Sequence, residues 1–266
     1  MVKILAIANQ KGGVGKTTTT MNLGHALAIS GKKVLIIDFD SQANLTKCMG
    51  IKRENIKNSI ATLMNLEIED EELPVKEDCI VTRNGVDIIA SDISLSAIDA
   101  KLQQSTIFAE KILSIIIDNF KDEYDYILID TNPSLGILTI NALTVADSVI
   151  IPMDTEAMSA DGLQGLLKTI SKVKKRINRK LEIEGILITM ADARTNLYKV
   201  VTETVKKSCE NHIYVFNTQI PRTVKVGEAN LKRMSIIEYN KNSVAAKAYM
   251  DLAKELVERN EKKTDC

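Results

Sequence analysis

The sequence predicts a single α/β domain in which a mostly parallel central sheet is flanked by helices on both faces. Short apolar runs of strand length alternate with longer amphipathic stretches along the chain. A glycine-rich turn separates the first apolar run from the first amphipathic stretch, and two later runs end in aspartate, at Asp38 and Asp130. The 266 residues contain no internal repeat and no low-complexity linker, so one domain over residues 1–266 is expected.

Composition narrows the possible classes of protein. Hydrophobic residues make up 45% of the chain but aromatic residues only 4%, so Ile, Leu, Val and Ala must fill the core. The formal net charge is zero, and any basic surface for nucleic acid must therefore be local. The four cysteines lie far apart, which argues against a metal knuckle or disulfide framework and favours a reducing cytoplasm. We expect no signal peptide, and no apolar run approaches the roughly 20 residues that span a bilayer.

The first strand is expected over residues 2–8 and the first helix over 19–30, with a glycine-rich turn between them. Glycines allow backbone N–H groups to face an anion without an intervening Cβ, and the start of the helix directs its positive dipole end at the same point. In such a loop Lys16 reaches the outer phosphates and the Thr17 hydroxyl ligates Mg²⁺. The expected phosphate-binding residues are Gly12, Gly13, Val14, Gly15, Lys16, Thr17 and Thr18.

The loop departs from the usual pattern G-x-x-x-x-G-K-[ST], because the first glycine of that pattern falls at Gln10. A second lysine, Lys11, stands at the head of the loop. This arrangement resembles the deviant Walker A motif of the ParA/MinD superfamily of ATPases, which implies a single-domain P-loop NTPase. The resemblance also implies that Lys11 crosses a dimer interface and touches the nucleotide of the partner subunit. The alternative is a glycine turn with two solvated lysines.

The second strand is expected over residues 32–40 and ends in Asp38 and Asp40. Acidic residues at the carboxyl end of a strand lie beside the nucleotide crevice in parallel α/β sheets. The resemblance implies that Asp40 orients the attacking water and that Asp38 lies near the Mg²⁺ ion. Ser41 replaces the proline usual in the family, a change that concerns the rigidity of the loop. The alternative is that the two carboxylates only cap the strand.

The middle of the chain is expected to contribute surface elements and one further site residue. Residues 44–78 are polar with short amphipathic pieces and an acidic run at 67–72, interpreted as a solvated helix or loop. A strand is expected over 86–90 and helices over 95–103 and 107–120. The strand expected over 124–130 ends in Asp130, a Walker B arrangement in which this carboxylate holds the Mg²⁺ shell. The following residues 131–136 resemble the switch loop of the family, with Asn132 in place of a proline.

The second half of the chain continues the alternation of helices and strands. Helices are expected over 137–145, 160–177, 196–209 and 243–259, strands over 147–152, 183–190 and 213–217, and a frayed tail over 260–266. The helix at 160–177 runs into a basic cluster that either contacts phosphates or is a solvated face. The cluster consists of Lys172, Lys174, Lys175, Arg176, Arg179 and Lys180.

Two segments resemble segments that bind DNA or the adenine base in proteins of this family. In Asp192-Ala-Arg-Thr-Asn-Leu197, Arg194 aligns with a basic residue used for non-specific DNA binding in Soj-like members; a local salt bridge is the alternative. The segment 220–229 resembles the family loop that packs on adenine, which implies ATP contacts for Pro221 and Arg222. Lys225 aligns with a second DNA-contacting arginine, and lysine keeps the charge but loses the planar fork.

The resemblance extends from residue 3 to about residue 258, and the family it matches best is the small, Soj-like ParA partition ATPases. It implies a slow, Mg²⁺-dependent ATP hydrolase with Lys11, Lys16 and Asp40 as catalytic residues. It further implies an ATP-dependent homodimer that binds DNA non-specifically, a stimulating partner of the ParB type, and a cytoplasmic, nucleoid-associated protein. The helix-turn-helix of larger ParA proteins is not expected, because nothing precedes the first strand.

Three other kinds of protein with the same phosphate-loop motif are alternatives. A MinD-like or other cargo-positioning ATPase needs a C-terminal amphipathic helix for a membrane, but residues 257–266 have almost nothing apolar, so no membrane partner is expected. A nitrogenase-iron-protein-like electron carrier needs paired cluster cysteines, which Cys79 and Cys209 do not match. A bacterial tyrosine kinase carries a C-terminal tyrosine cluster, whereas Tyr239 and Tyr249 are isolated.

Overall fold

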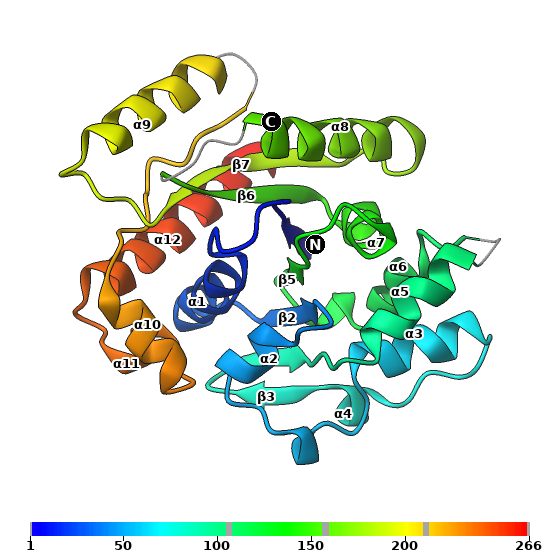
Figure 1. Ribbon diagram of the computed structural model, residues 1–266. Helices are drawn as coiled ribbons and strands as arrows, with labels where there is room; N and C mark the ends of the chain where they lie inside the picture. Colours follow the sequence, from blue (N-terminus) through cyan, green and yellow to red (C-terminus); the bar gives the residue numbers. More distant parts are fainter. Residues whose placement is uncertain (1, 105–107, 156–159, 210–212, 265–266) are drawn as a thin grey trace.

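The computed structural model describes residues 2–104, 108–155, 160–209 and 213–264. Among these residues, seven strands form one sheet in the order β3-β4-β2-β5-β1-β6-β7 (Figure 1). All neighbouring pairs are parallel except β3 with β4. The mostly parallel sheet confirms the predicted fold class. The strands are β1 Lys3–Ile7, β2 Val34–Phe39, β3 Val81–Arg83, β4 Val86–Ile89, β5 Tyr126–Thr131, β6 Ser148–Asp154 and β7 Glu182–Thr189.

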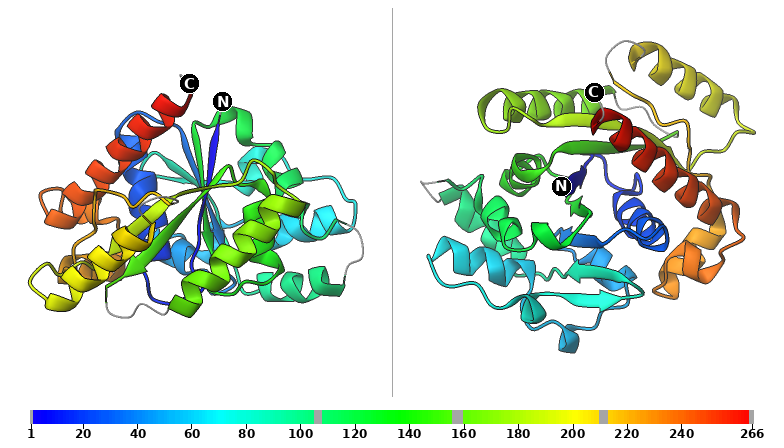
Figure 2. Two further views of the ribbon diagram at one scale, coloured as in Figure 1. Left: turned by 90° about the horizontal axis from the view of Figure 1, so that it is seen from above. Right: turned by 180° about the vertical axis from the view of Figure 1, so that it is seen from behind.

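The helices connect the strands, as parallel pairing requires. Figure 2 shows the sheet enclosed between two helical layers. Within the described ranges no helix has the length and apolar content needed to cross a bilayer. The helices are α1 Lys16–Ile29, α2 Asn44–Cys48, α3 Ile60–Ile68, α4 Lys76–Cys79, α5 Leu95–Gln104, α6 Ile112–Asp118, α7 Ile137–Val145, α8 Ala160–Arg176, α9 Asn196–Cys209, α10 Val224–Leu231, α11 Ile236–Tyr239 and α12 Val244–Thr264. Short 3-10 turns occupy Arg53–Asn55 and Lys121–Glu123.

Both faces of the sheet are apolar because successive side chains of a strand point to opposite sides. On β1, Ile4 and Ala6 belong to one buried cluster, and Leu5 and Ile7 belong to the other. The first cluster packs against α3, α5, α6, α7 and α8, and the second against α1, α10, α11 and α12. Full burial of an aliphatic side chain contributes roughly 1.5–3 kcal/mol, so two such layers compensate for the scarcity of aromatic residues.

Helix α1 begins earlier than the sequence pattern suggested. The expected start was residue 19, but the helix begins at Lys16, directly after Gly15, which has a φ of 85° and occupies the N-cap position. Further along the helix, a Cβ on Gly24 would lie 3.0 Å from the side chain of Ile36. This glycine therefore lets α1 lie close to β2, which brings the start of the helix to the edge of the sheet.

Some of the predicted elements are wrong. Strand β3 was not predicted, and the strand predicted over 213–217 is limited to a single bridge between Val215 and Ile186. The stretch 44–78 is not only surface, because Leu45 and Leu63 are fully buried in α2 and α3. The loop predicted at 220–229 contains the start of helix α10. The helix predicted from residue 107 begins at Ile112, and residue 107 itself lies outside the described residues.

The C-terminal helix is longer than predicted. It was expected to end at residue 259 with a frayed tail, but α12 continues to Thr264. The side-chain amide of Asn260 is shielded from solvent beside Tyr126, at the start of β5, so this part of α12 lies against the sheet. Residues 260–264 thus continue the helix where a frayed tail was expected, and residues 265–266 lie outside the described residues.

Candidate functional site

The loop between β1 and α1 lies at the carboxyl edge of the sheet. Gly13 and Gly15 have φ angles of 77° and 85°, a left-handed conformation that side chains with a Cβ rarely adopt. The hydroxyl of Thr189, at the end of β7, donates to the carbonyl of Val14 and so holds the loop from the other side of the crevice (2.9 Å). The loop therefore has the backbone geometry that a phosphate-binding turn requires.

Lys16 and Thr17 occupy the first turn of α1 and face the strand ends. The Lys16 side chain is buried, and its ammonium lies 3.3 Å from the carbonyl oxygen of Lys11, at the mouth of the loop. Burial lowers the pKa of Lys16, and the neighbouring carboxylates of Asp130 and Asp40 oppose this shift. The Thr17 hydroxyl donates to Asp130 Oδ2 at 2.7 Å. These contacts bring together three residues that the sequence assigned to phosphate and metal.

Asp38 and Asp130 are paired across the neighbouring strands β2 and β5, and both are fully buried. Burial raises the pKa of Asp38 to about 6, although the carboxylate accepts hydrogen bonds from the backbone and hydroxyl of Thr46 (2.8 and 2.7 Å). Burial and the nearby Asp38 raise the pKa of Asp130 well above its ordinary value. Two adjacent carboxylates at the strand ends thus form a site that favours a cation.

The donor set fits Mg²⁺. This ion takes oxygen ligands, usually one or two carboxylates together with phosphates and water. Asp130 Oδ1 is a buried oxygen with no hydrogen-bond partner in the described part of the chain, and the Thr17 hydroxyl lies beside the same carboxylate. A bound cation would satisfy this oxygen and favour the ionised form of both aspartates. Thr17, Asp38 and Asp130, the three predicted metal residues, therefore lie in one place.

Asp40 follows β2 and is half-buried at the entrance of the crevice. Its carboxylate accepts from the backbone N–H of Gln42 at 3.0 Å, and its carbonyl accepts from the hydroxyl of Ser91 at 2.8 Å. The turn containing Ser41 is thus fixed by hydrogen bonds at a position where the family has a proline. The Asp40 carboxylate also lies near enough to Lys16 to oppose the lowering of its pKa, so Asp40 faces the phosphate loop.

Lys11 has a partner that the sequence did not indicate. Its ammonium lies 2.9 and 2.7 Å from the two carboxylate oxygens of Asp154, at the end of β6. The Lys11 side chain is 31% exposed and that of Asp154 is 8% exposed. Asn9 supports this arrangement, since its amide donates to the carbonyl of Pro152 and accepts from the backbone N–H of Lys11. In a single subunit, Lys11 is therefore held by an internal carboxylate.

A cavity of about 280 Å³ adjoins the phosphate loop, and Pro221 and Arg222 line it together with residues of that loop. The structure thus brings the residues predicted to bind the phosphates next to those predicted to contact the base of ATP. Sequence reasoning missed Asn230 and Tyr249, which line the same cavity. Asn230 Oδ1 is buried and has no hydrogen-bond partner among the residues described, so it offers an acceptor to a bound base. The residues of the cavity are Gly13, Gly15, Thr18, Thr189, Met190, Ile220, Pro221, Arg222, Thr223, Val226, Gly227, Asn230 and Tyr249.

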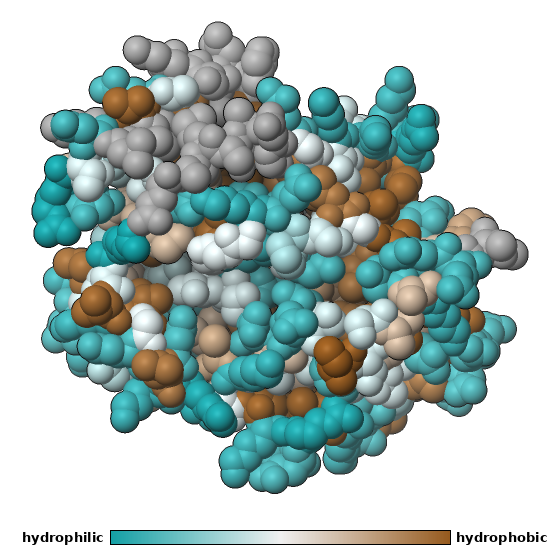
Figure 3. Space-filling view, in the orientation of Figure 1, coloured by the Kyte–Doolittle hydropathy of each residue, from teal (hydrophilic) through white to brown (hydrophobic). Residues whose placement is uncertain are grey.

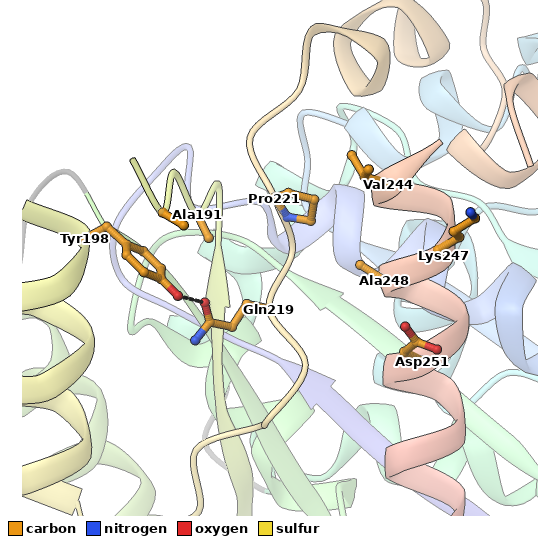
Figure 4. Close-up of a pocket in the computed structure, with 9 residues that line it drawn as sticks. Ala191, Tyr198, Gln219, Pro221, Val244, Lys247, Ala248 and Asp251 are labelled. Atoms are coloured by element: carbon orange, nitrogen blue, oxygen red, sulfur yellow. Dashed lines mark hydrogen bonds between the residues drawn. The ribbon is translucent and has the colours of Figure 1, made fainter. Parts of the chain in front are cut away.

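A second hollow, an open groove of about 390 Å³, lies on the outer side of Pro221 (Figure 4). Small apolar side chains form much of its floor. Lys247 and Asp251 extend from α12 on one side of the groove, and Tyr198 and Gln219, which are hydrogen-bonded to each other, lie on the other side. Pro221 therefore separates this groove from the cavity next to the phosphate loop.

The switch loop after β5 is held by side-chain contacts. The hydroxyl of Thr139 on α7 lies 3.1 Å from Asn132 Oδ1 and 2.5 Å from the carbonyl of Ser134. The backbone N–H of Gly136 donates to the Ser134 hydroxyl at 3.0 Å. Asn132, which replaces a proline of the family pattern, thus restrains the loop by a hydrogen bond instead of by a ring.

The two predicted DNA-binding residues are both exposed. Arg194 forms a bidentate pair with Asp192, with distances of 2.8 and 2.7 Å, and its side chain is 88% exposed. This pair holds the pKa of Asp192 at about 2, so the carboxylate is ionised at neutral pH. Lys225 lies in the first turn of α10, where its backbone N–H donates to the Thr223 hydroxyl. The local salt bridge considered for Arg194 is therefore present.

The chain resembles proteins of one kind over nearly its whole length. A family model described as an AAA domain matches residues 2–183. The sporulation initiation inhibitor protein Soj of Bacillus subtilis is 44% identical over 256 residues, which are 96% of this chain and 98% of that protein. The chromosome partitioning protein ParA of Caulobacter vibrioides is 37% identical over 261 residues, 97% of this chain and 95% of its own.

Solved structures extend the likeness to three dimensions. Cobyrinic acid a,c-diamide synthase from Mycobacterium smegmatis, with bound ADP and magnesium, has a TM-score of 0.83 at 31% identity and covers 98% of this chain and 96% of its own. The septum site-determining protein MinD from Pyrococcus horikoshii, complexed with Mg-ADP, has a TM-score of 0.76 at 25% identity and covers 96% of both chains.

Proposed function

This chain belongs to the Soj/ParA family of partitioning ATPases, and on that premise we propose that it is a DNA partition ATPase that dimerises when it binds ATP, holds DNA non-specifically as the dimer, and is released on hydrolysis. The observation that carries the proposal is the convergence of Lys16, Thr17, Asp38 and Asp130 at one edge of the sheet. Relatives of similar length match the chain over nearly its whole length, and one of them is named for chromosome partitioning.

ATP binds across the phosphate loop, with its base in the cavity beside Pro221 and Arg222. Backbone N–H groups of residues 12–18 surround the phosphates, and the Lys16 ammonium offsets their charge. Mg²⁺, when bound through Thr17 and the aspartates, neutralises charge that develops on the phosphates. The buried acceptor of Asn230 favours adenine, because the exocyclic amino group of adenine is a donor.

ATP also joins two subunits. The crevices of two copies face one another, and Lys11 leaves Asp154 to contact the nucleotide of the partner subunit. The Lys11 end of the ion pair is partly exposed, so water replaces part of the interaction when Lys11 leaves Asp154, and an exposed pair of roughly 0.2–1 kcal/mol is the lower limit for its strength. A phosphate in a closed interface is a stronger attraction than this pair, because water is excluded from it. Asp40 orients the water that attacks the γ-phosphate, and loss of that phosphate opens the dimer.

Dimerisation controls DNA binding. One subunit offers Arg194 and Lys225, whereas a dimer offers two copies of both. Affinity for DNA rises multiplicatively with the number of phosphates that a protein neutralises, so the dimer binds much more tightly than the subunit. A chain with zero net charge can bind DNA conditionally in this way. A centromere-binding partner of the ParB type stimulates hydrolysis, and the protein is cytoplasmic and associated with the nucleoid.

The main alternative is a MinD-like or other cargo-positioning ATPase that acts on a membrane or protein surface. A membrane anchor would need an apolar helix face that is free to enter lipid. In α12, Leu252 and Leu256 are fully buried against the sheet. The packing of this helix therefore favours DNA as the surface on which the protein acts.

The test is retention of random-sequence duplex DNA with ATP, with ADP and without nucleotide. We expect strong retention only with ATP, and loss of it in Arg194→Ala. A matched variant, Asp192→Asn, removes the carboxylate that pairs with Arg194 and should strengthen ATP-dependent binding. Equal retention in all three nucleotide states, or an ATP-dependent gain that Arg194→Ala leaves intact, contradicts the proposal.

A further inference from the structure

Helix α8 carries a row of cations on the side that faces away from the core. Lys168, Lys172, Lys175 and Arg176 are all exposed; Lys172 follows Lys168 by four residues, and Lys175 and Arg176 follow Lys172 by three and four. In an α-helix this spacing places them within an arc of roughly 100°. We call these four residues the α8 stripe. The stripe is flanked by three further exposed cations, Lys174, Arg179 and Lys180.

The stripe is not neutralised by the protein itself. Within the described ranges of the chain, no member of the stripe forms an ion pair, and the sequence of α8 contains a single acidic residue, near its start. Some exposed cations elsewhere are paired, such as Lys52 with Glu54 and Lys57 with Asp78, whereas the stripe places four unpaired cations side by side on one helix. Because the chain has no net charge, a row of unpaired cations concentrates positive potential at one place.

The ordinary structural explanation covers only part of the row. Cations in the last turn of a helix interact favourably with its dipole, which accounts for Lys175 and Arg176. This effect falls off within one turn and does not account for Lys168 and Lys172. Stabilisation of the helix is therefore an incomplete reason for the stripe.

The opposite face of α8 decides what kind of partner fits. Leu166, Ile170 and Val173 point into the core and are 0%, 3% and 2% exposed. A helix that binds a membrane surface inserts its apolar side into lipid, and here that side is already covered by the sheet. Only charge and hydrogen bonding remain for recognition, so the stripe fits a polyanion whose charges are regularly spaced.

The stripe lies away from the nucleotide crevice. Helix α8 starts after β6 and runs back to the amino edge of the sheet, where Asn178 donates to the carbonyls of Leu143 and Ala146. The phosphate loop lies at the carboxyl edge, at the other end of the strands. In Figure 3 the outer side of α8 is hydrophilic. Each subunit therefore presents a complete stripe whether or not its crevice is closed by a partner.

We infer that the α8 stripe contacts the phosphate backbone of duplex DNA independently of nucleotide. This inference rests on the proposed DNA-binding function and adds a second surface to it. From Lys168 to Arg176 the helix rises about 12 Å, a length along which duplex DNA carries about seven phosphate charges. The stripe supplies a weak hold that keeps an ADP-bound subunit near DNA between rounds of dimerisation.

The test compares two triple variants with equal loss of charge. The stripe variant is Lys168→Gln, Lys172→Gln and Arg176→Gln; the control is Lys52→Gln, Arg53→Gln and Lys57→Gln, whose cations are paired with carboxylates. Binding to a fluorescent random-sequence duplex is measured by anisotropy, without nucleotide, between 50 and 200 mM salt. With four phosphate contacts the wild type should lose ~150-fold in affinity over this range, and the stripe variant ~4-fold. The control variant should follow the wild type.

Two results overturn the inference. One is that the stripe variant shows the same salt dependence of DNA binding as the control variant. The other is that the wild-type protein does not bind DNA without nucleotide but sediments with anionic phosphatidylglycerol vesicles. A second series with ATP separates this inference from the proposed function. If the stripe variant binds DNA like wild type without nucleotide while the ATP-dependent gain persists, only the stripe inference fails. If wild type shows no gain with ATP, the proposed function fails, whatever the stripe does.

Discussion

The ammonium of Lys11 lies 2.7 Å from a carboxylate oxygen of Asp154 in the same subunit. If ATP draws Lys11 across an interface, this pair competes with dimerisation. A dimer breaks two such pairs, each worth at least the roughly 0.2–1 kcal/mol of an exposed pair, so Asp154→Asn should lower the dissociation constant of the ATP-bound dimer by at least about 2- to 30-fold. Lys11→Ala should abolish the dimer. Analytical ultracentrifugation with ATP measures both. A weaker dimer in Asp154→Asn would show instead that Asp154 orients Lys11 for its contact.

Asp130→Asn should increase the stability of the ligand-free protein but remove its stabilisation by Mg²⁺ with ATP. The wild-type carboxylate is fully buried and has a raised pKa, and one of its oxygens lacks a hydrogen-bond partner within the described chain. Removing this charge should raise the free energy of unfolding of the ligand-free protein by about 1–3 kcal/mol, the desolvation cost of an unsatisfied group. The variant should also lose the extra stability that Mg²⁺ with ATP gives to wild type. Urea unfolding with and without Mg·ATP tests both; equal stabilisation of variant and wild type by the ligand would argue against a metal role.

Asn230→Ala should weaken selection of the base. The buried Asn230 Oδ1 lines the cavity and lacks a hydrogen-bond partner in the part of the chain described, so it can accept from the amino group of adenine. A lost hydrogen bond of about 1 kcal/mol corresponds to a roughly 5-fold loss of ATP affinity. GTP, which has an acceptor at the same position, should bind the variant no worse than it binds wild type. Competition titrations with ATP and GTP measure the ratio, and an unchanged ratio removes Asn230 from base recognition.

His25 should make stability depend on pH. It is buried in α1, with Nε2 3.4 Å from Glu238, and burial lowers its pKa below the ordinary value, with Arg83 acting in the same direction against the opposing effects of Glu238 and the Met21 carbonyl. The unfolded chain therefore binds a proton more readily than the folded one. Stability is complete above about pH 6.5 and falls as the pH drops through the lowered pKa. Urea unfolding between pH 7.5 and 5 should show a steeper fall for wild type than for His25→Gln. Parallel curves for the two proteins would mean that His25 does not titrate there.

Glu255→Ala should affect both the fold and ATP binding. The Glu255 carboxylate accepts the Tyr214 hydroxyl at 2.6 Å and the N–H groups of Asn217 and Thr218 at 2.7 and 2.9 Å. Burial opposes its ionisation, but these hydrogen bonds hold the pKa of Glu255 below its ordinary value. Loss of the charged acceptor should cost about 1.5–3 kcal/mol and loosen the segment that leads to Pro221, which raises the Kd for ATP. Glu255→Gln, which keeps one acceptor, should lie between the two. Unchanged ATP affinity in Glu255→Ala would uncouple this anchor from the base cavity.

The central strands and the phosphate loop could be predicted because their signals are local. An apolar run, a glycine turn and the start of a helix follow one another in the sequence, and the strand-end aspartates follow from the same alternation. Strand β3 could also have been found. Asn84 and Gly85 have φ angles of 50° and 77°, and Asn-Gly is a strong hairpin signal that joins β3 to β4. It was missed because β3 has only three residues.

Other features depend on tertiary contacts and could not be predicted. The apolar run at 213–217 has the pattern of a strand, but Glu255 takes the N–H groups of Asn217 and Thr218, so the ladder does not continue. Asp154 lies in no motif. It meets Lys11 only because β6 is paired beside β1, which brings positions 143 apart in the chain together. A pattern within one segment carries no information about such a contact.

The position of β1 in the sheet has a consequence for synthesis of the protein on the ribosome. Strand β1 lies inside the sheet, and one of its two neighbours, β5, begins only at Tyr126, more than 100 residues later in the chain. At about 5–20 residues per second, the nascent chain carries the mostly apolar β1 segment without this neighbour for roughly 6–25 seconds. The speed of translation between β1 and β5, and the chaperones that shield the nascent chain, should therefore influence how much of this protein matures without aggregating.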